Sequence, residues 1–185
     1  MLLLKPHFKM LTFTLRCAHQ VFRGFLSQPV LSPEKAVVLS SRCWPLDCDV
    51  FLHMNNANYL TNAELTRWRT LPACKLISRA TSKEGLLFLA AENDIKYYRP
   101  LNMFQRYVIS STCRVGSDDK WFYYTHTFHE HPNDAKGDPK KFATVELKAV
   151  VKERSGKTIK PSTLLEDSDF YREWVTCCEV DKKDQ

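Results

Sequence analysis

Hydrophobic and polar residues alternate most regularly toward the C-terminal end of the chain, between residues 140 and 154. A period of two places successive side chains on opposite faces, which is the pattern of a β-strand with one buried face. The apolar face would contain Ala143, Val145, Leu147, Ala149 and Val151, and the polar face Thr144, Glu146 and Lys148. The pattern therefore predicts a strand that packs one side against a core.

Three more segments, 85–101, 104–115 and 120–129, are rich in β-branched and aromatic residues and also predict strands. The connections between them are polar, as expected for turns on the surface. Residues 35–44 predict one further strand, which Pro45 ends.

A helical periodicity runs from about Ala57 to Thr70, and Asn55 or Asn56 is well suited to cap its start. Pro72 marks a break, after which residues 73–80 are expected to form one short helix. The order of one strand, one helix and four antiparallel strands predicts an α+β fold.

The N-terminal segment has a different character, because no acidic residue precedes Glu34. At 100° per residue, basic and apolar side chains separate to opposite sides of a helix. The basic side contains Lys5, Lys9, Arg16 and Arg23, and the apolar side Phe8, Leu11, Leu15, Ala18, Phe22 and Phe25. We expect a mitochondrial presequence, with a helix on an anionic membrane surface or a plain docking helix as alternatives.

The composition of the 185 residues is ordinary for a globular protein, with 44% hydrophobic and 26% charged residues. It excludes disordered, collagen-like and membrane-spanning classes as the main description. The net charge of +6 favours anionic partners without selecting one. Seven cysteines without a C-x-x-C pair predict neither a disulfide framework nor a zinc site, and therefore a reducing compartment.

Reactive side chains are densest between residues 47 and 59, where the first core strand leads into the first core helix. The start of a helix presents backbone N–H groups with partial positive charge, and neighbouring acids can act as base or nucleophile. This combination suits an acyl carbonyl. The alternative interpretation is purely structural, with Asp47 and Asp49 forming turns and Asn55 capping the helix.

The string D-x-D-x-x-x-H-x-N-N-x-x-Y in this segment resembles the signature of the hotdog acyl-CoA thioesterases related to 4-hydroxybenzoyl-CoA thioesterase. The similarity is greatest to the group called thioesterase superfamily member six, over residues 40–152. It implies an antiparallel sheet wrapped around a long central helix, assembled as homodimers or homotetramers. The chain then divides into an N-terminal segment (1–33), a hotdog domain (34–160) and a tail (161–185) with a short helix around 168–178.

The resemblance also implies roles for individual residues of the motif. Asp49 would be the catalytic nucleophile or general base, and the backbone N–H of Asn56 would polarise the thioester carbonyl. Among the other motif residues, Asp47, His53 and Asn55 are expected mainly to hold the loop, and His53, Asn55 and Tyr59 to lie on the substrate side. Many relatives have Gly where this chain has Leu52, which predicts a differently shaped pocket.

Glu64 is a second catalytic candidate that follows from the residue pattern alone. The angular count places it in an apolar stripe made of Ala57, Leu60, Trp68 and Leu71. A buried carboxylate is costly unless it is paired, protonated or exposed to a wet pocket.

The remaining polar clusters predict less. His126, His129 and His131 lack a completing ligand, so no metal site is expected. Basic residues also cluster after the helix: Arg67, Arg69, Lys75, Arg79 and Lys83. We expect them to form a solvated surface, and the alternative is that they bind the phosphates of CoA. We therefore expect hydrolysis of a fatty or aromatic acyl-CoA, without a cofactor or nucleic acid. The rival hypothesis is a membrane-associated, non-catalytic protein that binds acyl-CoA or lipid.

Overall fold

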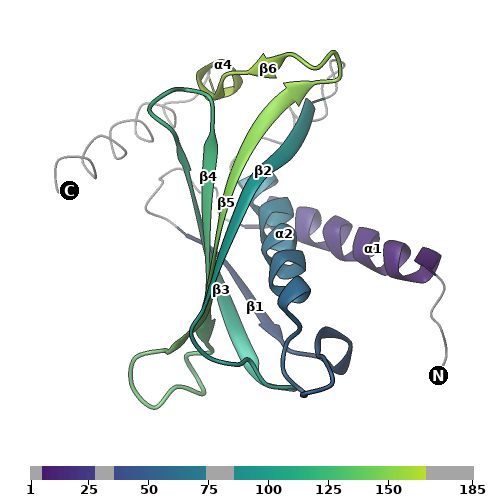
Figure 1. Ribbon diagram of the computed structural model, residues 1–185, viewed down its shortest axis with the longest axis vertical. Helices are drawn as coiled ribbons and strands as arrows, with labels where there is room; N and C mark the ends of the chain where they lie inside the picture. Colours follow the sequence, from purple (N-terminus) through teal and green to yellow (C-terminus); the bar gives the residue numbers. More distant parts are fainter. Residues whose placement is uncertain (1–5, 28–35, 74–85, 166–185) are drawn as a thin grey trace.

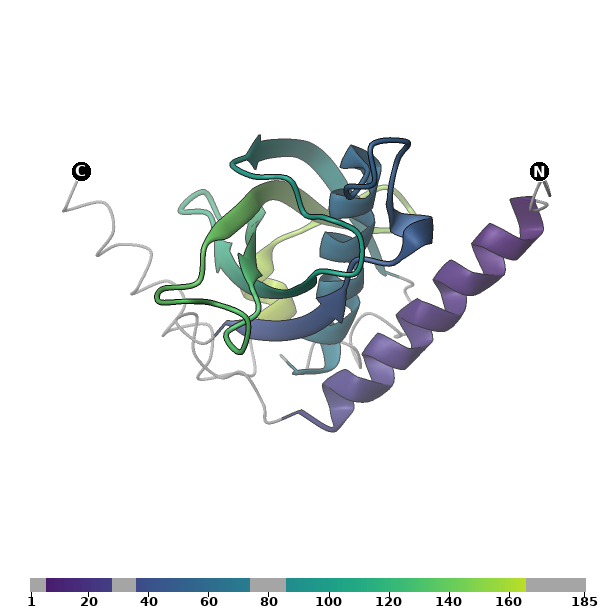
Figure 2. The ribbon, with the colours of Figure 1, turned by 90° about the horizontal axis from the view of Figure 1, so that it is seen from below.

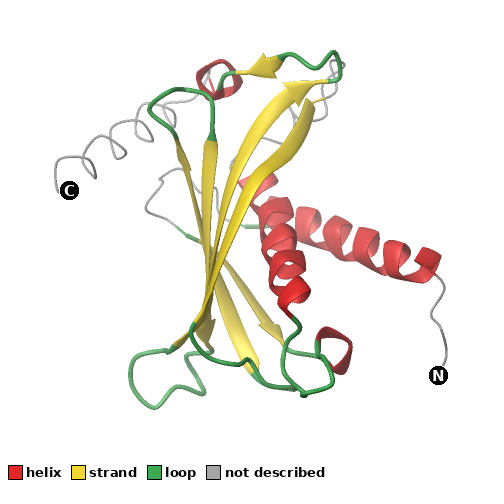
Figure 3. Ribbon diagram, in the orientation of Figure 1, coloured by secondary structure: helices red, strands yellow, loops and turns green. Residues whose placement is uncertain are grey.

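The fold consists of one antiparallel sheet, a long helix against its face and a second helix against the first (Figures 1 and 3). The computed structural model describes residues 6–27, 36–73 and 86–165. Its helices are α1 (Pro6–Phe25), the 3-10 turn η1 (Pro45–Asp47), α2 (Asn56–Ala73) and α4 (Pro161–Leu165). Its strands are β1 (Val37–Arg42), β2 (Leu86–Tyr97), β3 (Arg106–Val115), β4 (Phe122–Glu130), β5 (Lys141–Glu153) and β6 (Thr158–Ile159).

The sheet has the strand order β1-β3-β4-β5-β2, and β6 pairs with the far end of β5. All five long strands lie where the sequence predicts them, whereas the two-residue β6 was not predicted. The expected alternation in β5 is confirmed, because Ala143, Val145 and Leu147 are buried. The sheet curls around α2, as the view along the strands shows (Figure 2).

The core divides into two apolar clusters, one between the sheet and α2 and one between the sheet and α4. One surrounds Tyr59, Tyr107 and Phe128, and the other surrounds Phe122 and Leu147. Neither cluster includes the buried polar side chains of Ser111, Thr66, Thr70 and His126. Such groups are tolerated in a core only where hydrogen bonds satisfy them.

The buried side of α2 differs from the apolar stripe that the periodicity predicts. Ala57, Leu60 and Trp68 are exposed, while Tyr59, Asn62, Ala63, Leu65, Thr66 and Thr70 are buried. The threonine hydroxyls donate to helix carbonyls four residues earlier, which satisfies them without a partner in the sheet. The prediction of this apolar stripe as the buried face was wrong, because two sides of α2 are covered, one by the sheet and one by α1.

Helix α1 packs against α2 through a narrow strip of small and polar residues. Cys17 and Gly24 are buried in this contact, and Arg16 donates to Asn62 Oδ1 across it at 3.0 Å. A Cβ atom on Gly24 would lie 2.4 Å from the carbonyl oxygen of Arg69, so only glycine permits the approach. The predicted amphipathic helix is therefore present, and its apolar side faces away from α2.

That apolar side of α1 is exposed to solvent at Leu11, Leu15, Phe22 and Phe25, and Leu26, directly after the helix, is exposed as well. No helix in the described ranges is long and apolar enough to cross a membrane. The short helices predicted at 73–80 and 168–178 fall almost wholly outside the described residues.

Candidate active site

The motif loop is a closed turn between η1 and α2. The N–H of Asp49 donates to the carbonyl of His53 at 3.0 Å, and the N–H of Leu52 donates back to the carbonyl of Asp49 at 3.2 Å. The neighbouring segment clamps the turn, because Met54 donates to the carbonyl of Leu101 and Met103 donates to that of Leu52. These bonds hold the backbone at Asp49 in one conformation.

Asp47 anchors the base of this loop. Its carboxylate is buried and accepts the N–H of Trp44 at 2.9 Å. Its carbonyl oxygen accepts both the N–H of Asn55 and the side-chain amide of Asn58. Asp47 thus ties η1 to the start of α2, which is the loop-holding role expected of it.

Asp49 has a different environment, with its side chain 25% exposed. The Oδ1 atom accepts the N–H of Phe51 at 2.8 Å, which closes an Asx-turn. The Oδ2 atom lies 3.4 Å from Nδ1 of His53, and the rings of His53 and Phe51 stack with centroids 5.9 Å apart. One carboxylate oxygen therefore accepts a backbone N–H, and the other faces His53 on a side chain that is partly exposed.

Leu52 occupies a backbone conformation that leucine rarely adopts, with φ at 62°. The left-handed region costs a residue with a Cβ roughly 1–2 kcal/mol, and glycine avoids this cost. The side chain is 59% exposed, so burial does not compensate for the strain. Glycine at the position of Leu52 would avoid this backbone strain, which explains why many relatives have it. The predicted change of pocket shape at Leu52 stays a prediction.

The start of α2 leaves one backbone donor available. Asn55 Oδ1 accepts the N–H of Ala57 at 2.9 Å, and the carbonyl of Asn55 accepts the N–H of Asn58. Asn55 is therefore the N-cap. In the described parts of the chain, the N–H of Asn56 has no such acceptor, so it stays free for a ligand.

Glu64 lies further along α2 in a cavity of about 120 Å³ between the helix and strands β2, β4 and β5. It forms an ion pair with Arg67, one helical turn later. Arg67 also lies over the ring of Tyr124, and burial lowers the pKa of its guanidinium, an effect that Tyr124 and Cys113 partly oppose. Arg67 is therefore not part of the solvated basic face that the sequence predicts.

His126 lines the same cavity and was not predicted to belong to a site. Its side chain is 0% exposed, and Nδ1 lies 2.7 Å from Oγ of Ser111 on the neighbouring strand. Burial, and then the charge of Arg67, lowers the pKa of His126 to about 3. The sequence gives no signal for His126, because it lies in an otherwise regular strand. The polar residues around it come from other segments and meet it only in the folded protein.

Tyr59 lies in the core and does not line the cavity beside Glu64. Its ring packs edge-on against Tyr97 and Phe128, with centroids 5.3 and 5.1 Å away. Burial raises the pKa of its phenol to about 12. The structure gives this motif residue a packing role, and contact with a substrate would require the core to open.

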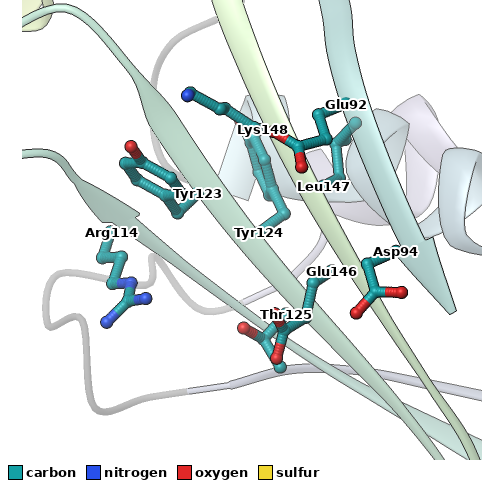
Figure 4. A pocket seen from close by; sticks show the side chains of 9 residues that line it. All are labelled: Glu92, Asp94, Arg114, Tyr123, Tyr124, Thr125, Glu146, Leu147 and Lys148. Carbon is teal, nitrogen blue, oxygen red and sulfur yellow. The ribbon is translucent and has the colours of Figure 1, made fainter. Parts of the chain in front are cut away.

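A second hollow, of about 160 Å³, lies between strands β2, β3, β4 and β5 (Figure 4). Its acidic and basic side chains are mixed, and two of the bases lie against aromatic rings. Arg114 lies 5.5 Å from the ring centre of Tyr123, and Lys148 lies 4.6 Å from that of Trp121. Within the described ranges, no three His, Cys, Asp or Glu side chains are grouped to hold a metal ion.

The sequence of residues 43–167 matches the family model described as the thioesterase-like superfamily. The chain belongs to this superfamily. The matched region begins just before the motif loop and spans α2 and strands β2 to β6.

Known proteins resemble the chain in sequence and in fold. Protein THEM6 of Drosophila melanogaster is 29% identical over 117 residues, which are 63% of this chain and 60% of that protein. The chain thus aligns with less than two thirds of the fly protein. The probable thioesterase YbaW of Escherichia coli superposes with a TM-score of 0.57 at 19% identity, covering 75% of this chain and 96% of YbaW.

A variant of 4-hydroxybenzoyl CoA thioesterase in complex with 4-hydroxybenzoyl CoA superposes with a TM-score of 0.60 at 13% identity. The match covers 71% of this chain and 97% of that one. These likenesses confirm the α+β hotdog fold, in which the antiparallel sheet wraps the central helix α2.

Proposed function

We propose that the protein hydrolyses an acyl-CoA thioester, with Asp49 as general base or nucleophile. The observation that supports this most directly is the Asp49 carboxylate, held by the motif loop through Oδ1 on a side chain that is 25% exposed. The same loop leads into α2, whose first N–H, that of Asn56, would donate to the carbonyl oxygen of the substrate. A donor aimed at the developing oxyanion is worth about 3 kcal/mol in the transition state.

The reaction then needs no cofactor. With Asp49 as base, a water molecule loses a proton to the carboxylate and adds to the thioester carbonyl. The C–S bond breaks as the tetrahedral intermediate collapses, and the CoA sulfur leaves with the proton. With Asp49 as nucleophile, the carboxylate adds to the carbonyl carbon and the C–S bond breaks to release the CoA thiolate, which leaves a mixed anhydride that water then hydrolyses. Glu64 is the alternative base, although its ion pair with Arg67 would have to open.

Release of free thiol from purified protein tests this proposal. The panel should include short, long and aromatic acyl-CoAs, because neither fatty nor aromatic substrates are favoured by the motif itself. Turnover of at least one of them supports the proposal. Binding without turnover across the whole panel favours the rival hypothesis, a hotdog protein that only binds acyl-CoA or lipid.

We further propose that the protein works at a membrane surface rather than as a matrix protein that has lost its N-terminal segment. Two observations support this location. The contact of Gly24 and Arg16 with α2 makes α1 part of the folded unit, so its removal would uncover α2. The opposite, apolar side of α1 lies in solvent, which suits an interfacial helix.

Flotation with liposomes that contain anionic lipid tests this location. We expect the protein to float, and Leu15→Glu with Phe22→Glu to abolish flotation because both side chains lie on the exposed apolar side. Leu46→Glu, at a still more exposed apolar position on η1, is the control and should float. Cleavage of residues 1–33 on import into isolated mitochondria would instead support the presequence.

A further inference from the structure

A chain of side-chain hydrogen bonds connects α1 to the base of the motif loop. Arg16 on α1 donates to Oδ1 of Asn62 at 3.0 Å, and Nδ2 of the same amide donates to the carbonyl of Asn58 at 2.8 Å. Nδ2 of Asn58 in turn donates to the carbonyl of Asp47 at 2.9 Å. We call these four residues the Arg16 chain. It joins α1, α2 and the motif loop, which lie apart in the sequence.

The orientation of the Asn62 amide is set by its two partners. A guanidinium can only donate, so Oδ1 must face Arg16, and a carbonyl can only accept, so Nδ2 must face Asn58. Asn62 is 1% exposed, so water has little access to either bond. Arg16 therefore selects this orientation, because the opposite one would set the oxygen of Asn62 against the carbonyl oxygen of Asn58.

The far end of the Arg16 chain holds both groups of the proposed reaction. The carbonyl of Asp47 also accepts the N–H of Asn55, the N-cap of α2. Asp49 follows Asp47 by two residues, and Asn56, whose N–H would meet the oxyanion, follows Asn55 directly. A displacement of the Asp47 carbonyl would therefore change the distance between the base and the donor. Such distances matter, because a displacement of about 1 Å can lower a rate about 10²-fold.

We propose that Arg16 is a positioning residue, which holds the reacting groups of the hydrolase in place from α1 through the chain that ends at the Asp47 carbonyl. The inference rests on the proposed function and adds to it a residue that touches no reacting atom. Its loss should lower kcat with little change in KM, because the contacts that bind the substrate in its ground state stay the same. The segment 1–33, which the sequence predicts as a presequence, is then needed for full activity.

Steady-state kinetics of two substitutions at Arg16 test the proposal. Arg16→Met keeps an unbranched apolar stem and loses every donor, and we expect kcat to fall about tenfold with KM changed less than about twofold. Arg16→Lys keeps a charged donor and should recover kcat to within about threefold of wild type. Arg23→Met removes the same charge from α1 outside the Arg16 chain and should match wild type. Equal kcat in Arg16→Met and Arg23→Met overturns the proposal.

Asn62→Asp separates positioning from the docking of α1. The carboxylate still accepts from Arg16, so α1 stays against α2, but it cannot donate to the carbonyl of Asn58. We expect kcat to fall about tenfold, as in Arg16→Met, while Cys17 in the helix contact stays protected from alkylation. This variant also tests the proposal if Arg16→Met does not fold. A normal kcat in Asn62→Asp would show that Arg16 only docks the helix, which overturns the proposal.

A double-mutant cycle tests whether the two ends of the Arg16 chain act together. Arg16 and Asn58 are joined through Asn62 in this chain. Once Asn58→Ala has removed the bond to Asp47, the further change Arg16→Met should lower kcat no more, because the chain is already broken. Effects of the two changes that multiply would instead show independent roles and contradict the chain.

Amide hydrogen exchange measures the positioning without turnover. In Arg16→Met and in Asn62→Asp, the backbone amides of residues 47–58 should exchange faster, and those of β5 should exchange as in wild type. Faster exchange confined to residues 47–58 supports the coupling of Arg16 to the loop even if no thioester is hydrolysed, in which case the proposed function alone fails. Unchanged exchange of residues 47–58 in both variants overturns the inference even if hydrolysis is found.

Discussion

The Oδ2 atom of Asp49 lies 3.4 Å from the Nδ1 atom of His53, four residues later in the same closed turn. The distance is longer than a good hydrogen bond and short enough for an ion pair. His53 therefore orients the carboxylate without occupying it, and Oδ2 keeps a lone pair for water or for the thioester carbon. A substitution of the Asp49 carboxylate can therefore be expected to change activity without unfolding the loop.

Asp49→Asn is expected to lower turnover of acyl-CoA by at least about 10²-fold, the lower range for loss of a positioned base. The amide oxygen still accepts the N–H of Phe51, so the turn and the thermal stability should be nearly unchanged. Affinity for acyl-CoA should persist, which separates kcat from KM. Steady-state kinetics and a thermal melt of the same preparation check both statements.

Two controls locate the base. Asp47→Asn should reduce stability more than turnover, because this buried carboxylate holds the N–H of Trp44. Glu64→Gln removes the ion pair with Arg67 and leaves the motif loop unchanged. Loss of activity in Glu64→Gln, combined with an active Asp49→Asn, would place the base on α2 rather than in the loop.

Leu52→Gly is expected to stabilise the protein, although it shortens a side chain. It removes a left-handed backbone cost of about 1–2 kcal/mol, against roughly 0.5–1 kcal/mol for the greater freedom of glycine in the unfolded chain. The net gain should lie between about 0 and 1.5 kcal/mol in urea denaturation. Leu46→Gly, at an exposed position without positive φ, is the matched control and should be destabilising.

The sequence predicted the elements of this molecule better than the contacts between them. Alternation in β5 follows from local chemistry, because one face of that strand meets a core whatever its partner. Which residues of α2 are buried could not be predicted in this way. Helix α1 covers a second side of α2, where Arg16 donates to Asn62. The cavity was missed for the same reason, since His126 and Glu64 come from distant segments that only the folded sheet brings together.

Gly24→Val is expected to separate α1 from α2, because the new side chain would overlap the carbonyl of Arg69 and the ring of Pro72. Cys17, buried in the same contact, would then react faster with an alkylating reagent, as followed by peptide mass spectrometry. Ala18→Val on the exposed side of α1 is the control and should leave Cys17 protected. Equal protection in both variants would show that the helix contact tolerates bulk.

Self-association is expected through the edge strand β2, which ends the sheet and exposes Leu87 and Leu89. A long edge with apolar side chains tends to pair with another chain, so the protein should be at least a dimer. Leu89→Lys should shift it toward monomer in sedimentation experiments. Val38→Lys on the other edge strand, β1, starts from similar exposure (49% against 42%) and should not. Wild type that sediments only at 21.5 kDa at micromolar concentration would contradict the assembly.

His126 should make the folded state sensitive to acid. Burial, and then the charge of Arg67, lowers its pKa from the ordinary 6.5 to about 3, so the unfolded chain takes up a proton in a range where the folded chain does not. Stability is therefore full above pH 6.5 and falls as the pH drops toward 3, by about 1.4 kcal/mol per pH unit.

Between pH 7.5 and pH 5 this single residue should cost about 2 kcal/mol of the free energy of unfolding, measured by urea denaturation. The double variant Ser111→Ala with His126→Phe should lose that much less than wild type over the same interval, because no imidazole is left to protonate. His129 is the internal comparison, since burial and then Lys141 lower its pKa as well. His129→Phe should therefore remove only its own share of the acid sensitivity. A wild type and a double variant with parallel stability profiles would mean that His126 already reaches solvent protons in the folded state.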